Sequence, residues 1–166
     1  MSSVTLLLAL VDEAFDRKAW HGTTLLGSIR GLDAATASRR PKSGRHNIWE
    51  VVVHAAYWKY AVRRRLAGEK RGSFALAGSN WFVRPVSGPK PSSGRAAAGA
   101  LAAAFGEDVR LLVAEHRELR RVIEAMPESA LNERAGTNTK AYLIRGIAAH
   151  DLYHAGQIQL IKRIVS

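Results

Sequence analysis

The chain has 166 residues, enough for one domain with a buried core, and 47% of them are hydrophobic, which is ordinary for a globular protein. No apolar run reaches the ~18 residues of a transmembrane helix, and the start of the chain passes into Asp12 and Glu13 without a basic signal segment, so we expect a cytoplasmic protein. The absence of cysteine excludes disulfides, thiolate metal ligands and a cysteine nucleophile.

The chain is strongly basic, with a formal net charge of +11 and a pI near 10.7. Such a charge can attract nucleic acid, acidic lipid or an anionic substrate. The basic residues are scattered, however, and the consecutive residues Arg63, Arg64 and Arg65 would fan over about 200° of a helix instead of addressing one groove. Because no spacing typical of a nucleic-acid-binding motif occurs, we expect a solvated basic surface and neither a nucleic-acid nor a membrane partner.

The N-terminal third predicts one long helix and two short ones. Apolar residues recur at helical spacing over 3–18, at Val4, Leu7, Leu8, Val11 and Phe15. Gly22 then interrupts the pattern, and two short helical segments follow before Pro41, the second capped by Asp33. Trp20 and His21 lie at the break, where they could border a cavity of the bundle, although a histidine beside glycine is more often a surface or capping residue.

A second long helix is expected over 48–67, closed by Gly68. Asn47 and Glu50 have the spacing of a capping box at its start. His54 shares a face of this helix with Trp58, which is either a wall of a pocket or a plain core residue. His46 precedes the cap, so we expect it to be exposed.

Helical periodicity fails over 69–94, where glycine, serine, proline and asparagine dominate. A loop this long inside a compact domain is usually functional or mobile. It carries Trp81, Phe82 and Arg84, which a simple linker would not need. We expect the loop to fold over one end of a bundle and shape the substrate entrance; the alternative, that its aromatic residues only fasten the loop, has equal weight.

A third long helix is expected over 95–126, ended by Pro127, with 128–139 as the connection to the last helix. His116 falls on its apolar stripe. A lone histidine there is more often a hydrogen-bonded core residue than a ligand, so His116 is a core residue or a contributor to the pocket.

The segment 143–158 carries His150 and His154 within an otherwise apolar helix. Four residues advance a helix by about 400°, so both imidazoles leave the same, inward face. They either hydrogen-bond within the core or share a divalent metal, which neutral imidazole binds at about 2.0–2.1 Å. Gln157 could orient an imidazole, whereas Asp151 lies on a different face and is better placed to serve a neighbouring helix.

His54 favours the metal interpretation, because it is a third inward histidine on a second helix. Three protein ligands with at least one open position are typical of reactive metal sites. Zn²⁺ and Ni²⁺ are the expected ions, although three histidines also suit Cu²⁺ or Fe²⁺. The predicted ligands are His54, His150 and His154, with Trp58, His116, Asp151 and Gln157 as candidates for the pocket or for contacts to the ligands.

The two histidine helices also resemble a known family. The segments reading NIWEVVVHAAYW and AAHDLYHAGQI, together with Trp20-His21-Gly22, are similar to the DinB/YfiT-like superfamily of metal-dependent four-helix bundles. The resemblance runs from about Leu6 to Ile164 and implies the same three histidines as the ligand triad. The superfamily includes transferases and isomerases that use bacillithiol or mycothiol, and also members of no known activity, so it implies the site more strongly than the reaction.

We therefore expect one all-α domain over 1–166, a four-helix bundle with a long loop between its second and third helices. The expected function is that of a divalent-metal-dependent enzyme, which uses either an external low-molecular-weight thiol, as an S-transferase, or a metal-activated water, as a hydrolase. A small-molecule substrate and a homodimer are the expected partners. The rival is a non-catalytic metal-binding or stress-related bundle that acts through self-association.

Overall fold

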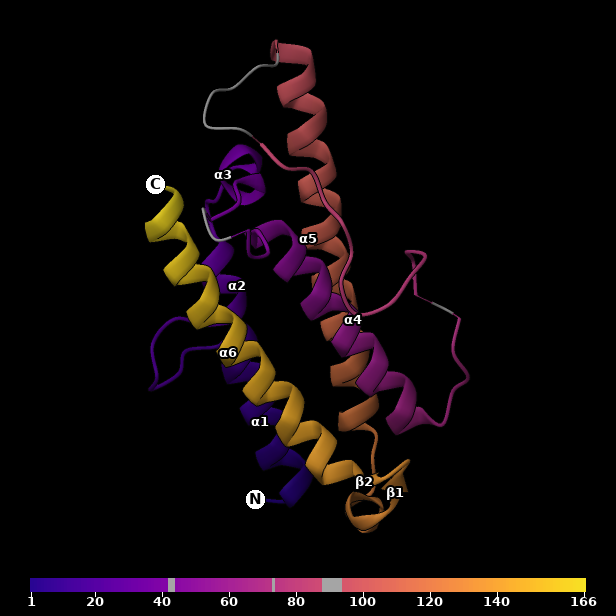
Figure 1. Cartoon of the computed structure of the whole chain (residues 1–166). Helices are drawn as coiled ribbons and strands as arrows, with labels where there is room; N and C mark the ends of the chain where they lie inside the picture. Colours follow the sequence, from indigo (N-terminus) through magenta and orange to yellow (C-terminus); the bar gives the residue numbers. More distant parts are fainter. Residues whose placement is uncertain (42–43, 73, 88–93) are drawn as a thin grey trace.

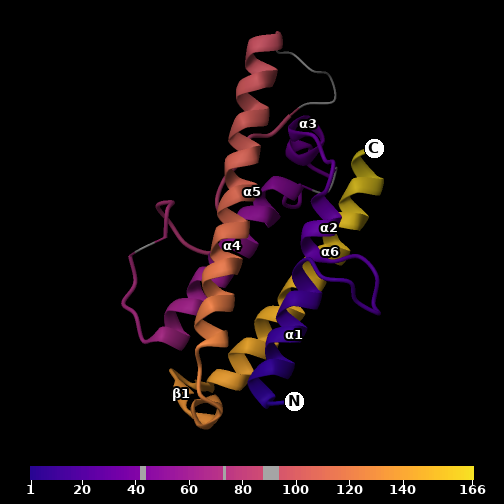
Figure 2. The same ribbon diagram turned by 180° about the vertical axis from the view of Figure 1, so that it is seen from behind.

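The computed structural model describes residues 1–41, 44–72, 74–87 and 94–166, and its long helices form a bundle (Figure 1). The four long helices are α1 (Ser3–Phe15), α4 (Ile48–Ala67), α5 (Arg95–Glu124) and α6 (Lys140–Val165). Helix α6 packs between α1 and α4, and α5 packs on the other side of α4 and also contacts α1. The view from behind shows α1 and α6 side by side again (Figure 2). The expected all-α bundle is confirmed.

Short helices fill one end of the bundle. Helix α2 (Leu25–Ile29) begins at Thr24 and lies against α6, and α3 (Ala34–Ser38) begins at Asp33 and lies against α4 and α5. In both, the cap side chain accepts a hydrogen bond from a backbone N–H of the first turn, which satisfies a group that the helix itself cannot.

Helix α4 has the bounds that its capping residues predict. The Asn47 side chain accepts from the backbone N–H of Glu50 at 2.8 Å, and the Glu50 carboxylate accepts from the backbone N–H of Asn47 at 3.1 Å. Gly68 ends the helix in the left-handed conformation, at φ 71°. Almost every residue in the first half of α4 is buried, so this helix forms the centre of the bundle.

The connection from α5 to α6 contains more structure than expected. A 3₁₀ turn, η1 (Glu128–Asn132), is followed by the strands β1 (Arg134–Ala135) and β2 (Asn138–Thr139), which pair antiparallel. Gly136 has φ 78° at the first position of the two-residue turn, as a type II′ hairpin requires. The strands contain only two residues each and the Gly-Thr turn signal is short, so the hairpin is not evident from the sequence and does not change the all-α class.

The connection from α4 to α5 has no helix in its described part, 69–72 and 74–87; its remaining residues lie outside the described part of the chain. Phe82 is buried against Tyr57 and Phe74, with ring centroids 5.6 and 5.4 Å away. The Arg84 guanidinium pairs with Asp108 of α5 at 2.7 Å. These two side chains therefore fasten the loop to the bundle, as the second interpretation of the loop expected.

A buried ion pair joins α4 to α6. Lys59 and Asp151 both have no exposed side-chain surface, and the Lys59 ammonium donates to Asp151 Oδ2. The ammonium also lies over the ring of Phe15 from α1, 4.7 Å from its centroid. Asp151 thus serves a neighbouring helix, as its position on α6 indicated.

His116 lies in the core beside this ion pair. Its ring stacks on Phe15 at a centroid distance of 3.7 Å, and its Nε2 is 3.7 Å from the carboxylate of Asp12. The Nε–H of Arg120 already donates to both oxygens of that carboxylate, so the carboxylate offers His116 little stabilisation as a cation. Burial lowers the pKa of His116 to about 2, and the positive charge of Lys59 acts in the same direction.

Removal of one charge of the buried pair should be costly. Lys59→Met should lower the free energy of unfolding by about 3–5 kcal/mol, because it leaves the Asp151 carboxylate buried without its ammonium. The double variant Lys59→Met/Asp151→Leu should recover most of that loss. Urea denaturation followed by circular dichroism measures both changes. Lys140→Met, which removes the more exposed pair with Glu133, is the matched control and should cost less than about 1 kcal/mol. A double variant as unstable as the single one would contradict this account.

The burial of neutral His116 predicts a dependence of stability on pH. Below an unfolded pKa of about 6.5, the unfolded chain takes up a proton that the folded chain refuses until its own pKa of about 2, so acidification destabilises the folded state. Between pH 7 and pH 5, wild type should lose about 2 kcal/mol more than His116→Phe. Denaturation of the metal-free protein at the two pH values tests this, and equal losses would show that His116 is protonated in the fold.

Candidate metal centre

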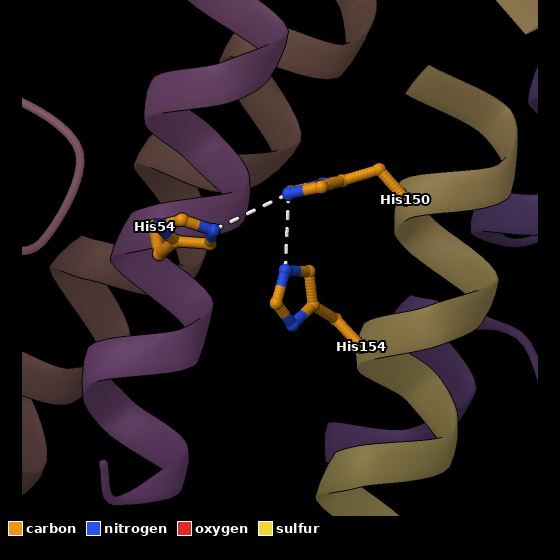
Figure 3. A group of neighbouring side chains, drawn as sticks. All are labelled: His54, His150 and His154. Atoms are coloured by element: carbon orange, nitrogen blue, oxygen red, sulfur yellow. Dashed lines mark hydrogen bonds between the residues drawn. The ribbon is translucent and has the colours of Figure 1, made fainter. Parts of the chain in front are cut away.

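Three histidines converge between α4 and α6. His54 lies in the middle of α4, and His150 and His154 lie one turn apart on α6, so that the three rings point toward one another (Figure 3). The Nε2 atom of His150 is 3.3 Å from Nε2 of His54 and 3.0 Å from Nε2 of His154. Three nitrogens at 2.0–2.1 Å from one tetrahedral metal would be about 3.3–3.4 Å apart. Two spacings of the triad are therefore close to those of a metal site, and all three ligand atoms lie within 4.8 Å of one another.

The second ring nitrogens of His54 and His154 are held by partners that fix the orientation of these two rings, whereas Nδ1 of His150 is buried without a hydrogen-bond partner in the described part of the chain. His54 Nδ1 donates to the backbone carbonyl of Asn80 at 2.8 Å, and His154 Nδ1 donates to Oε1 of Gln157 at 2.7 Å. A proton on Nδ1 leaves the lone pair of Nε2 free, and in both residues that lone pair faces the centre of the triad. His54 and His154 therefore both direct a lone pair, and no proton, at Nε2 of His150. A metal cation at the centre would accept the Nε2 lone pairs of all three rings.

The charge state of the imidazoles also suits a metal. Burial lowers the pKa of His54 to about 4 and that of His150 to about 3, and the neighbouring histidines add to both effects. Burial lowers the pKa of His154 as well. All three rings are therefore neutral at pH 7, which is the form that ligates a metal. Because the donors are neutral, a divalent ion held here would keep its full charge.

Trp81 of the loop is the main aromatic contact of the site. Its ring stacks parallel on His54 at 3.8 Å and on His46 at 3.6 Å. Two imidazoles at these distances would overlap on one face, so they cover opposite faces of the indole. His46 is therefore partly covered, with Nδ1 3.1 Å from Glu50 and 44% of its side chain exposed, so the expectation that it is exposed holds only in part. Its stacking partner lies 35 residues along the chain, out of reach of local reasoning.

Trp58 borders the triad. Its ring centroid is 6.3 Å from that of His54 and 6.1 Å from that of His150, and its Nε1 donates to the side-chain oxygen of Asn80 at 2.9 Å. Trp58 is thus a wall of the site and not a plain core residue. Asn80, which sequence reasoning missed, adopts the left-handed conformation at φ 64°, and asparagine tolerates it better than most residues. No pattern in the sequence pairs Asn80 with His54.

The remaining candidates lie elsewhere. His116 contacts Phe15 and Asp12 in the core and does not join the triad. Asp151 follows His150 directly, but its carboxylate is engaged by Lys59. Trp20 and His21 are exposed, so they are surface residues at the break before α2, as the second interpretation of this break expected. Of the four candidates beyond the ligands, the structure brings Trp58 and Gln157 to the site.

None of the described helices has an apolar stretch long enough to cross a membrane.

A match to a family model identifies the family to which the chain belongs. No curated protein and no solved structure matches the chain significantly. The family model of the DinB superfamily, however, matches residues 17–158, a stretch that includes all three histidines. The chain therefore belongs to the DinB superfamily.

Proposed function

We propose that the chain holds one divalent metal ion, Zn²⁺ or Ni²⁺, through His54, His150 and His154, and that the site catalyses a reaction of a small-molecule substrate. The convergence of three neutral Nε2 atoms carries this proposal. Neutral nitrogen donors suit both ions, and a carboxylate-rich site for Mg²⁺ or Ca²⁺ would look different.

The residues around the triad would have distinct tasks. Asn80 and Gln157 hold the protons of His54 and His154 on Nδ1, so that Nε2 stays available to the ion. Trp81 covers one face of the His54 ring and Trp58 lies edge-on to it, so both limit access of water from the loop side. A bound divalent ion would supply Lewis acidity, which lowers the pKa of a thiol or a water placed beside it.

The absence of cysteine narrows the thiol chemistry. A thiol-transfer reaction on this chain requires a diffusible low-molecular-weight thiol, because no protein sulfur can act as the nucleophile. We place S-transfer from such a thiol first and hydrolysis by an activated water second. A cytoplasmic location, where such thiols are abundant and reduced, belongs to the same proposal.

A non-catalytic role through self-association is the rival function. Leu6 and Leu10 of α1 are 55% and 42% exposed, which leaves two leucines on one face of a bundle helix in contact with solvent. A homodimer through this face would cover them and is compatible with either function. The non-catalytic function is the better account only if the metal-loaded protein shows no turnover.

Metal content tests the ligand set. Purified wild type should retain about one divalent ion per chain after dialysis, and His54→Ala and His150→Ala should each lose most of it, since two imidazoles bind far more weakly than three. Elemental analysis by mass spectrometry measures the content. His21→Ala removes an exposed histidine and is the matched control, with unchanged content expected. Equal metal in His54→Ala and wild type would remove His54 from the site.

Turnover separates the three functions. With 1-chloro-2,4-dinitrobenzene as electrophile, the thiol sulfur forms the new carbon–sulfur bond, chloride leaves and the thiol proton passes to solvent. Metal-loaded wild type should accelerate this reaction with bacillithiol or mycothiol, and His150→Ala or a chelator should reduce the rate to that of free metal. Metal-dependent cleavage of 4-nitrophenyl acetate without thiol reactivity would favour the hydrolase. Absence of both activities would favour the non-catalytic rival.

A further inference from the structure

A second feature lies directly beside the triad: a hollow of about 540 Å³ between the start of α4, the C-terminal half of α6 and Trp81. This volume is within the range of small-molecule sites. Its apolar wall is formed by Pro41, Val51, Leu160, Ile161 and Ile164. Its aromatic and polar wall is formed by Arg45, His46, Trp81, Tyr153 and Gln157.

The hollow shares two side chains with the candidate metal centre. Trp81 lines the hollow and stacks on His54 at 3.8 Å. Gln157 lines it and accepts the hydrogen bond of His154 Nδ1 at 2.7 Å. A molecule bound in the hollow would therefore touch the partners of two predicted ligands, and would lie where a substrate of the metal site is needed.

The charge of the hollow favours an anion. Within the described part of the chain, no residue pairs with the Arg45 guanidinium; the recorded contact of Arg45 is through its backbone carbonyl, which accepts from Arg40. The nearby carboxylate is that of Glu50, which is 2% exposed and already paired with Arg40 and His46. An anionic group in the hollow would meet a free cation and no free carboxylate.

The indole of Trp81 does not offset this preference. A ligand cation would seek an aromatic face, but His46 and His54 cover both faces of Trp81. The indole presents only its rim, which is the positive part of the ring's quadrupole. The rim and Arg45 therefore both select against a cation.

We propose that this hollow is the subsite for the acceptor substrate, and that it takes a small amphipathic anion: an aromatic or branched apolar body with a carboxylate or sulfonate. The anionic group faces Arg45, and the apolar body lies against Leu160, Ile161 and Ile164. Its role as a substrate site rests on the proposed function, whereas its capacity to bind such an anion does not.

Two fluorescent probes with nearly the same rings test the preference. 8-Anilinonaphthalene-1-sulfonate carries the anionic group, and N-phenyl-1-naphthylamine lacks it. Wild type should bind the sulfonate at one site per chain and about tenfold more tightly than the amine. Arg45→Glu should lower the affinity for the sulfonate by at least about tenfold and change the affinity for the amine by less than about twofold. Leu160→Glu, on the exposed apolar rim, should lower the affinity for both probes.

Arg145→Glu is the matched control, because it makes the same charge change at an exposed position of α6 outside the hollow. It should leave both affinities unchanged. An equal loss in Arg145→Glu and Arg45→Glu would reduce the effect to overall charge, and equal affinity for the two probes, or no effect of either substitution in the hollow, would overturn the proposal.

The link to the metal centre is tested separately. Saturating sulfonate should alter the visible absorption of the Co²⁺-loaded protein through Trp81 and Gln157, and an unchanged spectrum would overturn the subsite role. Probe binding is also measured without metal. If wild type binds no metal but Arg45→Glu still weakens sulfonate binding, the proposed function fails and the anion site stands. If wild type binds metal but Arg45→Glu leaves sulfonate binding unchanged, the anion site alone fails.

Discussion

The contact between α4 and α6 is the constraint on which the rest of the structure depends. Along this seam the two helices bury His54 and His154, partly bury His150, and bury the Lys59–Asp151 ion pair, whose carboxylate directly follows His150 on α6. Each group is costly to bury alone: an unpaired ammonium or carboxylate would cost several kcal/mol, and a buried imidazole gives up its charge. Both sets are satisfied at the same time in only one register of the helices, because a shift by one turn would separate Lys59 from Asp151 and His54 from the other rings. We infer that the ion pair fixes the register in which the three Nε2 atoms meet.

The burial of α4 explains why the loop takes part in the site. The backbone carbonyls of α4 are used within the helix, and α6 meets the His54 ring through His150 and His154, of which His150 contacts its other nitrogen, Nε2. The carbonyl of Asn80 supplies the acceptor for Nδ1 of His54, and Trp81 then follows onto the ring. Phe82, buried two residues after Asn80, anchors this arrangement to the core. The loop is therefore part of the candidate metal centre. Buried Phe82 holds the loop in place, while Asn80 and Trp81 contact the ring of His54.

The parts of this structure that could be predicted from sequence are those set by local physics. Cap residues and apolar periodicity gave the bounds of α4 and the inward direction of His54, His150 and His154, because helix geometry links neighbours in sequence to neighbours in space. The Gln157 contact could be anticipated because the residue lies one turn from His154. The contacts of Asn80, Trp81 and Lys59 depend on how separate segments meet, which no local pattern encodes. His116 marks the same limit: its position on a buried stripe was predictable, but its partners Phe15 and Asp12 come from α1.

The excess of positive charge is only partly balanced by ion pairs in the structure. Arginines at several points are neutralised by acids: Arg40 by Glu50, Arg63 by Glu115 and Glu69, Arg84 by Asp108 and Arg120 by Asp12. With 25 basic and 14 acidic residues, many cations must go without such a partner, and most of these do so in water, where the cost is small. Arg45 is exposed as well, but it borders an apolar hollow that shares Trp81 and Gln157 with the triad. An anion whose apolar body fills this hollow would displace water near Arg45, and their attraction would strengthen as the local dielectric constant falls. The net charge would then act at two ranges: the basic surface draws anions toward the protein, and Arg45 retains the one that also fits the apolar wall.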